Sequence, residues 1–329
     1  MRRMMACLGM ILAFGLWTAS AQAQERTLRY SDINAQSSGA GIFTDRFAEL
    51  VRKKTEGRVA IEVYYGGTLS GFDITPVQTG IVDLTQWGLS TDFCPFMSVL
   101  QAPYLYDGDE QLLRITHYDS PIFKRINECL ESGGTNVRLV TIYSWGFQNL
   151  LTTDRPVRSL ADVQGLKIRV VPLKIFMETV RAMGGTPTPM PWSEVMTSLM
   201  TGVIDGTGMP IVYVVPAGLH EIEKHYALTR HNPTLSGVYI NADVWNGLSP
   251  ADQQSMLESG EEARQHLHEY MEKTNARYLE EIKVAGVEVV PFEALAIDEA
   301  AIRDGVREVF KDDWGETYDE ILRLLDQEK

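Results

Sequence analysis

Residues 158–210 read RSLADVQGLKIRVVPLKIFMETVRAMGGTPTPMPWSEVMTSLMTGVIDGTGMP, and this stretch decides the fold. It contains a short strand-like run that includes Arg169, and helix-forming segments then lead to a Gly-rich turn near Met209. Open α/β folds bind ligands at the carboxyl ends of parallel strands. A guanidinium at such a strand end forms two parallel hydrogen bonds to a carboxylate, which a lysine cannot do. The stretch predicts an anion-binding platform rather than a catalytic centre.

Strand and helix patterns alternate upstream of this stretch. Residues 27–32, 58–65 and 82–87 have the composition of strands, and 58–65 alternates with a period of two. Residues 43–55 have the pattern of an amphipathic helix. Its apolar face carries Phe47, Leu50 and Val51. The order strand–helix–strand predicts a mostly parallel α/β sheet.

Two longer segments connect this sheet to the rest of the chain. The β-rich run 137–153 is long enough to cross from one domain into another. Residues 250–285 consist mostly of good helix formers. After Pro250 at its start, this run contains no proline and one glycine, Gly260. A helix of that length reaches about 50 Å, which exceeds the diameter of a small domain. We therefore expect it to lie across two domains. Ser193 is the expected N-cap of a helix in the opening stretch.

The first 23 residues have the pattern of a secretory signal peptide. Arg2 and Arg3 precede the apolar run 8–17, which is too short to span a bilayer, and the A-x-A motif at 21–23 follows. Cleavage near Ala23 would place the mature protein in the periplasm. What remains of the 329 residues suggests two domains rather than one. No later stretch has the length of a membrane span, so stable membrane insertion is not expected.

Charge and cysteine content limit the partners further. The formal net charge is −14, which argues against nucleic acid and against anionic membrane surfaces. A local basic group inside a cleft still permits an anionic ligand. Cys94 and Cys129 remain after the signal peptide, and an oxidising compartment permits a disulfide between them. Two buried free thiols are the favoured alternative.

Motifs for catalysis and for cofactors are missing from the sequence. His220 and His225 flank an acidic segment, but their i, i+5 spacing keeps the two imidazoles off one helical face, unlike the spacing of a zinc protease. Neither a G-x-S-x-G elbow nor a P-loop occurs. We expect no metal, no cofactor and no enzymatic activity, although triads assembled from distant positions leave a secreted hydrolase as an alternative.

The order of short motifs resembles a known family. The run Pro156-x2-Ser159-Leu160-Ala161-Asp162-x2-Gly165-Leu166-Lys167-Ile168-Arg169-Val170 resembles the central signature of the solute-binding proteins of tripartite ATP-independent periplasmic (TRAP) transporters, the DctP-like family. Further matches are Gly184-Gly185-Thr186-Pro187, Ser193-Glu194-Val195, Thr201-Gly202-Val203-Ile204-Asp205-Gly206, Thr55-Glu56-Gly57-Arg58 and Ala102-Pro103-Tyr104-Leu105-Tyr106. The resemblance runs from about residue 27 to at least residue 290.

The resemblance implies a two-domain, hinged α/β periplasmic binding protein, type II-like, whose long helix spans both domains. Domain I would comprise 24–146 plus 235–274, and domain II 147–234 plus 275–329, with the ligand cleft between them. Such a protein captures a small organic acid and delivers it to the TRAP membrane permease subunits. The family's carboxylate-binding arginine corresponds to Arg169, and its aromatic wall corresponds to Trp192.

Two departures from the family pattern point to the ligand. Met209 stands where relatives often place an asparagine that touches the carboxylate, and Gln148 and Asn149 stand in the region of a second arginine. Both changes remove a polar or charged side chain that could contact the ligand, so we expect a monocarboxylate with an apolar or aromatic body. The candidate ligand-binding residues are Arg169, Trp192, Met209, Asn149, Gln148, Trp87, Trp145, Asp32 and Asn34. The alternatives are a sugar acid or other hydroxy or keto acid in the same class, and a binding protein of an ATP-driven importer.

Overall fold

The computed structural model describes residues 26–71, 73–89, 91 and 93–326. The predicted signal peptide and its cleavage near Ala23 lie outside the described residues. Eleven strands occur in the described part, and their bounds are β1 Arg26–Ser31, β2 Val59–Tyr64, β3 Leu84–Gly88, β4 Val137–Phe147, β5 Asn149–Thr152, β6 Lys167–Val170, β7 Thr186–Pro189, β8 Gly206–Met209, β9 His225–Ala227, β10 Pro233–Asn241 and β11 Glu288–Val290. Within the same ranges no helix combines the length and apolarity needed to cross a membrane.

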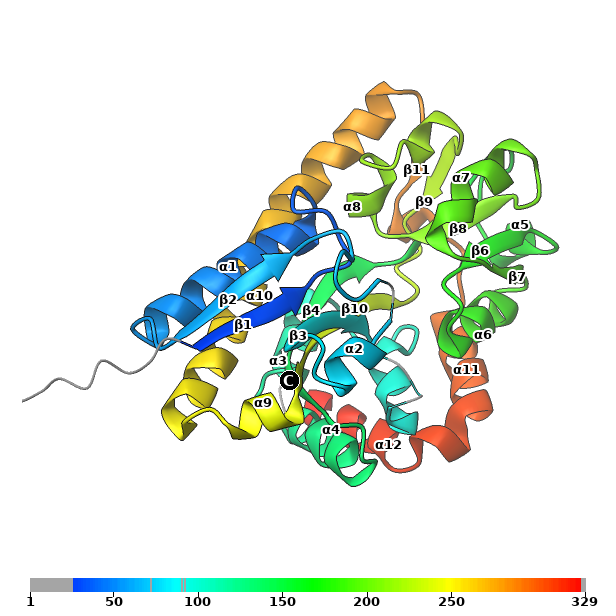
Figure 1. The fold of residues 1–329 in the computed structure, drawn as a ribbon. Coiled ribbons are helices and arrows are strands. Elements are labelled where there is room, and N and C mark those ends of the chain that lie inside the picture. Colours follow the sequence, from blue (N-terminus) through cyan, green and yellow to red (C-terminus); the bar gives the residue numbers. More distant parts are fainter. Residues whose placement is uncertain (1–25, 72, 90, 92, 327–329) are drawn as a thin grey trace, which may run out of the picture.

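Helices cover both faces of these strands (Figure 1). Their bounds are α1 Gly39–Lys54, α2 Thr75–Gln78, α3 Asp109–Ile115, α4 Pro121–Ser132, α5 Leu160–Val163, α6 Lys174–Ala182, α7 Trp192–Met200, α8 Ile211–Val214, α9 Ala242–Asn246, α10 Pro250–Val284, α11 Glu299–Trp314 and α12 Thr317–Asp326, with 3-10 turns η1 Pro95–Gln101, η2 Leu219–Glu221 and η3 Phe292–Ala294.

The strands form two sheets. The first has the order β2-β1-β3-β10-β4 and the second has the order β11-β9-β5-β8-β6-β7. The expectation of a mostly parallel sheet is correct for β1, β2 and β3, but β10 pairs antiparallel with both β3 and β4. The second sheet is mixed as well, since β5 runs antiparallel to β8 and β9. The expectation was wrong for these strands because β10 returns from the second sheet instead of following a crossover helix.

Two short connections pass between the sheets. The β-rich run 137–153 divides into β4 in the first sheet and β5 in the second, with Gln148 between them. The return passes through residues 228–232, between β9 and β10. Backbone hydrogen bonds join these connections, because Gln148 N donates to Asn232 O at 2.8 Å and His231 N donates to Gln148 O at 3.0 Å. The crossing of the run 137–153 between two layers is therefore as the sequence predicted.

Helix α10 is one continuous helix of 35 residues, as predicted (Figure 1). Ser249 caps its start by accepting a hydrogen bond from Asp252 N at 3.2 Å, and Pro250 occupies the first turn. Its N-terminal part packs against α1 and β4, and its C-terminal part reaches α8 and β11. The helix therefore contacts elements that belong to both sheets.

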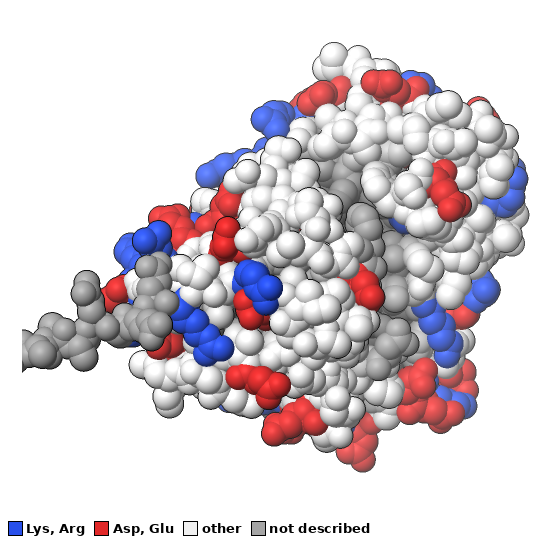
Figure 2. All heavy atoms as spheres, viewed as in Figure 1, with Lys and Arg blue, Asp and Glu red and all other residues white. Residues whose placement is uncertain are grey.

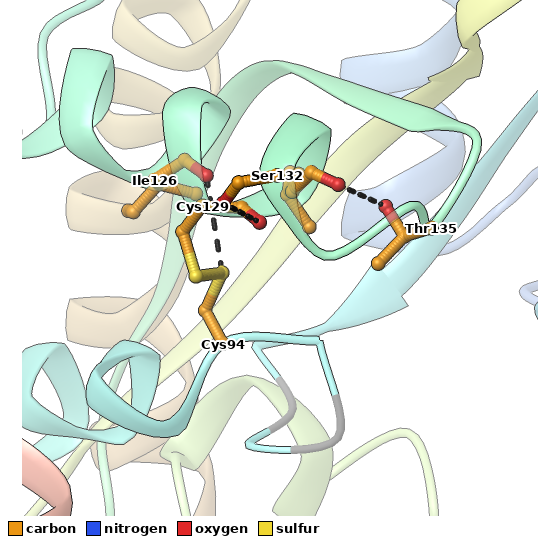
Figure 3. The surroundings of a disulfide bond; sticks show 6 residues. Cys94, Ile126, Cys129, Ser132 and Thr135 are labelled. Atoms are coloured by element: carbon orange, nitrogen blue, oxygen red, sulfur yellow. Dashed lines mark hydrogen bonds between the residues drawn. A yellow bond between two sulfur atoms is a disulfide. The ribbon is translucent and has the colours of Figure 1, made fainter.

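Cys94 and Cys129 form a disulfide, which joins the segment before η1 to α4 (Figure 3). The preference for two buried free thiols was wrong. The two cysteines are 35 residues apart in the sequence, and their Cα atoms lie 6.1 Å apart, within the range that a disulfide spans. Spacing along the chain cannot show that η1 and α4 pack side by side, so the sequence left this contact open.

Candidate ligand-binding site

A cavity of about 740 Å³ lies between the two sheets. The first sheet contributes side chains from β3, β4 and β10, and the second contributes side chains from β6, β8 and the starts of α7 and α8. Figure 2 shows this face of the molecule as largely uncharged surface with acidic and basic side chains scattered over it. The cavity is of a size typical of small-molecule sites.

Seven of the nine residues predicted from the sequence line this one cavity. They are Asn34, Trp87, Trp145, Gln148, Arg169, Trp192 and Met209. They come from positions more than 170 residues apart in the chain, and the two short connections between the sheets bring them together.

Asp32 and Asn149 do not line the cavity. The Asp32 carboxylate is fully buried and accepts hydrogen bonds from Asn34 N at 2.8 Å and from Thr44 Oγ1 at 2.7 Å. The Asn149 amide donates to the Tyr226 hydroxyl at 2.9 Å and accepts from the Arg230 backbone at 2.9 Å. Both side chains turn into the protein and hold cavity-lining segments in place, because a strand-end position does not by itself fix where a side chain points.

Arg169 is held at the second-sheet side of the cavity by one edge of its guanidinium. Nε and Nη2 both donate to the backbone oxygen of Met190, at 3.3 and 3.1 Å. Nη1 lies 3.8 Å from Met209 Sδ, which is a weak acceptor. Because an arginine has five N–H groups, hydrogens on both Nη1 and Nη2 remain available. These are the donors of a bidentate contact with a carboxylate.

No carboxylate within the described ranges compensates the charge of Arg169. Its side chain is only 4% exposed, and none of the ion pairs in that part of the protein includes it. Burial lowers the pKa of Arg169 to about 10, so the guanidinium stays protonated at neutral pH. A buried cation without a partner is costly, and an anion that enters the cavity would relieve this cost.

Aromatic rings extend from Arg169 across the cavity. The Arg169 guanidinium lies 5.6 Å from the centroid of the Trp192 ring, within the range of a cation–π contact. Tyr213 follows, at 6.5 Å from Trp192 and 5.6 Å from Trp145, centroid to centroid. The sequence analysis missed Tyr213, because the segment IVYV of α8 has the apolar composition of a core segment. We refer to Arg169, Trp192, Met209 and Tyr213 as the second-sheet wall.

The opposite side is a hydrogen-bonded set of uncharged side chains, which we refer to as the first-sheet wall. Asn34 Nδ2 donates to Gln86 Oε1, and Gln86 Nε2 donates to Ser236 Oγ at 2.9 Å. Trp145 Nε1 donates to the same Ser236 oxygen at 2.9 Å. All four side chains line the cavity. Gln86 and Ser236 were missed because each lies inside a strand, where only the sheet topology shows which face meets the cavity.

The sequence expectation for Ser193 is corrected by the structure. It was expected to cap the helix that follows it, but Pro191 occupies the N-cap position of α7 and Ser193 lies in the first turn. The described lining of the cavity includes Ser193 and Ser236 but no His, Cys, Asp or Glu. A serine nucleophile needs such a base within hydrogen-bond reach. Among the residues that the structure describes, no group of three or more His, Cys, Asp or Glu side chains forms a possible metal site. The arrangement is that of a binding site.

The family follows from a match over most of the chain. Residues 30–317 match the model of the bacterial extracellular solute-binding proteins, family 7, known as DctP. The chain belongs to this family. A solute-binding protein of Chromohalobacter salexigens is 30% identical over 86% of this chain and 84% of its own length. The 2,3-diketo-L-gulonate-binding periplasmic protein of Escherichia coli is 27% identical over 94% of both chains.

Solved structures agree with this assignment. A TRAP periplasmic solute-binding protein from Ochrobactrum anthropi, in which the C-terminus is bound in the ligand-binding pocket, superposes with a TM-score of 0.83 and 25% identity. The match covers 93% of this chain and 96% of that chain. This protein is therefore a TRAP solute-binding protein of a periplasmic family, whose members bind small ligands and work with TRAP permeases. The relatives are transport proteins rather than enzymes.

Proposed function

We propose that this protein captures a monocarboxylate with an apolar or aromatic body and delivers it to a TRAP permease. The observation that carries the proposal is Arg169, a buried cation that faces the cavity without an acidic partner in the described chain. Its free hydrogens on Nη1 and Nη2 would bind the two carboxylate oxygens. No second Arg or Lys side chain lines the described cavity, which supports one carboxylate rather than two.

The body of the ligand would lie against the aromatic side chains. Trp192, Tyr213 and Trp145 form a row of rings across the cavity, and Trp87 and Met209 add apolar surface. Aromatic rings supply large apolar contact areas in a defined orientation. The exposed fraction of Trp192 is 45%, which is high for a tryptophan and is expected of a side chain that a ligand covers.

The two halves would close around the ligand about the connections between the sheets. Gln148 and the segment 228–232 lie at these connections, and Gln148 also lines the cavity. Under this proposal the domains are 24–146 plus 235–274 and 147–234 plus 275–329. Closure would exclude water from Arg169 and strengthen its contact with the carboxylate.

A thermal-shift screen with organic acids tests the proposal. We expect shifts with monocarboxylates such as phenylacetate and hexanoate, and smaller shifts with succinate and with neutral sugars. The Arg169→Met variant should fold and lose the shifts, whereas Arg181→Met, a change on the exposed face of α6, should keep them. Stabilisation by neutral sugars but by none of the acids would contradict the proposal.

A further inference from the structure

We propose that Asp32 sets the direction of the hydrogen bonds in the first-sheet wall, so that this wall selects an acid with a hydroxyl group remote from its carboxylate. The inference rests on the proposed function, because it assigns the second polar group of the same ligand. It gives a role to a buried carboxylate that does not itself line the cavity.

The first step is that Asp32 acts as an acceptor. Its Oδ1 atom accepts from the backbone N–H of Asn34 at 2.8 Å, a group that can only donate. A carboxylate oxygen that accepts one N–H offers its second lone pair to a further donor. The Asn34 side chain, whose Nδ2 lies 2.9 Å from the same oxygen, must therefore turn its NH2 group and not its oxygen toward Asp32. The orientation of the Asn34 amide is thus fixed by chemistry.

The second step is that this orientation passes along the wall. The other hydrogen of Asn34 Nδ2 goes to Gln86 Oε1, so Gln86 must present its NH2 group to Ser236. Ser236 Oγ then accepts from Gln86 Nε2 and from Trp145 Nε1, each at 2.9 Å. A hydroxyl oxygen has two lone pairs, and both are occupied here.

The third step concerns the groups that are left for a ligand. Asn34 keeps its Oδ1 acceptor and Gln86 keeps its second N–H, whereas the Ser236 hydroxyl faces Tyr143. A ligand group that accepts from such a donor and also donates to an amide oxygen is a hydroxyl. A second carboxylate would meet the Asn34 oxygen, which has no hydrogen to donate to it, so the wall disfavours it.

The fourth step places this hydroxyl relative to the carboxylate. The ring of Trp145 lies next to Tyr213, at 5.6 Å, and Tyr213 lies 6.5 Å from Trp192. Trp192 in turn contacts Arg169. The rings therefore separate the first-sheet wall from the arginine. A ligand that reaches both has an apolar body between its hydroxyl and its carboxylate.

Matched acids test the inference on the mature protein after unfolding and refolding to remove bound ligand. The probes are 4-hydroxyphenylacetate, phenylacetate and 4-methoxyphenylacetate, together with 6-hydroxyhexanoate and hexanoate, titrated by calorimetry. We expect the hydroxy acid of at least one pair to bind about 10-fold or more tightly than its deoxy partner. The methoxy analogue should not recover this gain, because it cannot donate to Asn34.

Variants separate the role of Asp32 from general destabilisation. Asp32→Leu, which leaves Asn34 without an acceptor at this position, should bring the affinity ratio of hydroxy acid to deoxy acid close to one and leave the deoxy acid bound. Gln86→Met interrupts the same series of hydrogen bonds further along, and it serves as the second test if Asp32→Leu does not fold. Thr44→Val removes a hydrogen bond of Asp32 without touching Asn34, so it should leave the ratio unchanged.

Each remaining outcome has a distinct meaning. Equal affinity within every pair, with binding still lost in Arg169→Met, overturns the inference and leaves the proposed function standing. A ratio above 10 that persists in both Asp32→Leu and Gln86→Met overturns the role of Asp32. If no acid binds, both the inference and the proposed function fail.

Discussion

The two walls of the cavity are each backed by a buried carboxyl group, and the two groups differ in their hydrogen bonds. Asp32, behind the first-sheet wall, accepts from Asn34 N, Asn34 Nδ2 and Thr44 Oγ1. Glu223, behind the second-sheet wall, accepts from Thr207 Oγ1 at 3.1 Å, and its Oε1 atom has no hydrogen-bond partner among the residues that the structure describes. Both residues have an exposed fraction of 0%. The two carboxyl groups are therefore equally buried, but Asp32 accepts more of the hydrogen bonds that would stabilise a negative charge.

Glu223 lies close behind the second-sheet wall. Thr207, the partner of Glu223, lies beside Arg169 in the register of β6 and β8. Burial raises the pKa of Glu223 to about 8, so this carboxyl is largely neutral at pH 7 and does not compensate the arginine. The side chains of the first-sheet wall are hydrogen-bonded to one another before a ligand arrives, whereas Arg169 in the second-sheet wall has no anionic partner in the described chain.

The largest expected effect concerns pH and Glu223. Its pKa is about 8 in the folded protein against an ordinary 4.5, so the folded state holds the proton more tightly. The contribution to stability is complete below pH 4.5 and is lost as the pH rises through 8, by up to about 5 kcal/mol. Denaturant unfolding at pH 5 and pH 8.5 should show this fall in the wild type and not in Glu223→Gln.

The exposed neighbour Glu221 supplies the control for this measurement. Glu221→Gln should follow the wild-type pH dependence. His231 acts in the opposite sense, since burial lowers its pKa to about 3 and stability falls as the pH drops below 6.5. The quantity to compare is therefore the difference between wild type and variant at each pH. Parallel curves for wild type and Glu223→Gln would show that Glu223 is ionised in the folded protein.

The next effect is on binding through Arg169. Arg169→Met should weaken the affinity for phenylacetate at least 100-fold, about 3 kcal/mol, because the variant offers no charged donor. The same change should leave the stability of the empty protein unchanged or higher, since it removes an unpaired buried cation. Calorimetric titration and denaturant unfolding measure the two quantities. Arg169→Lys, which keeps the charge without the fork, should bind with intermediate affinity.

A third test applies the same chemical change to the first-sheet wall. Asp32→Asn should lower the free energy of unfolding by about 1–3 kcal/mol at pH 7, because an amide accepts the hydrogen bonds of Asn34 more weakly than a carboxylate does. Glu223→Gln, in contrast, should already be stabilising at pH 7, by about 3 kcal/mol, because the wild type loses its protonation-linked stability between pH 4.5 and pH 8. If the two substitutions change the unfolding free energy equally at pH 7, the proposed difference between the walls is wrong.

The smallest expected effect is at Met209. Met209→Asn places an amide where Sδ now lies 3.8 Å from Arg169 Nη1. The N–H groups of the new amide should raise the affinity for succinate a few-fold, by less than about 1 kcal/mol. The affinity for phenylacetate should rise by a smaller factor. Competition titrations with the two acids measure the ratio. Met209→Leu, which keeps the apolar volume, should leave that ratio unchanged.

Periodicity and composition predicted much of the architecture. The run 137–153 crosses between the sheets, and the long helix α10 begins at Pro250, because both patterns are local in the sequence. The antiparallel placement of β10 was not predictable, since strand direction depends on the route of the chain through the second sheet. The Cys94–Cys129 disulfide depends likewise on how η1 packs against α4.

The site was predictable where a residue type carries its own chemistry. Arg169 and Trp192 were predicted because the resemblance to the family places its carboxylate-binding arginine and its aromatic wall at these two positions. Gln86 and Ser236 carry ordinary side chains inside strands, and only the pairing of β10 with β3 brings them together. Asp32 and Asn149 were placed in the correct region, but their side chains turn inward because backbone and amide donors lie there.

Helix α10 constrains how the cavity opens. The two connections between the sheets would allow rotation in several directions if they were the only links. The same rigid helix, however, packs on α1 and β4 at one end and on α8 and β11 at the other. Any relative motion of the sheets must bend this helix or slide its side chains along their contacts. An opening motion of the two sheets would therefore be restricted in direction by the contacts of α10.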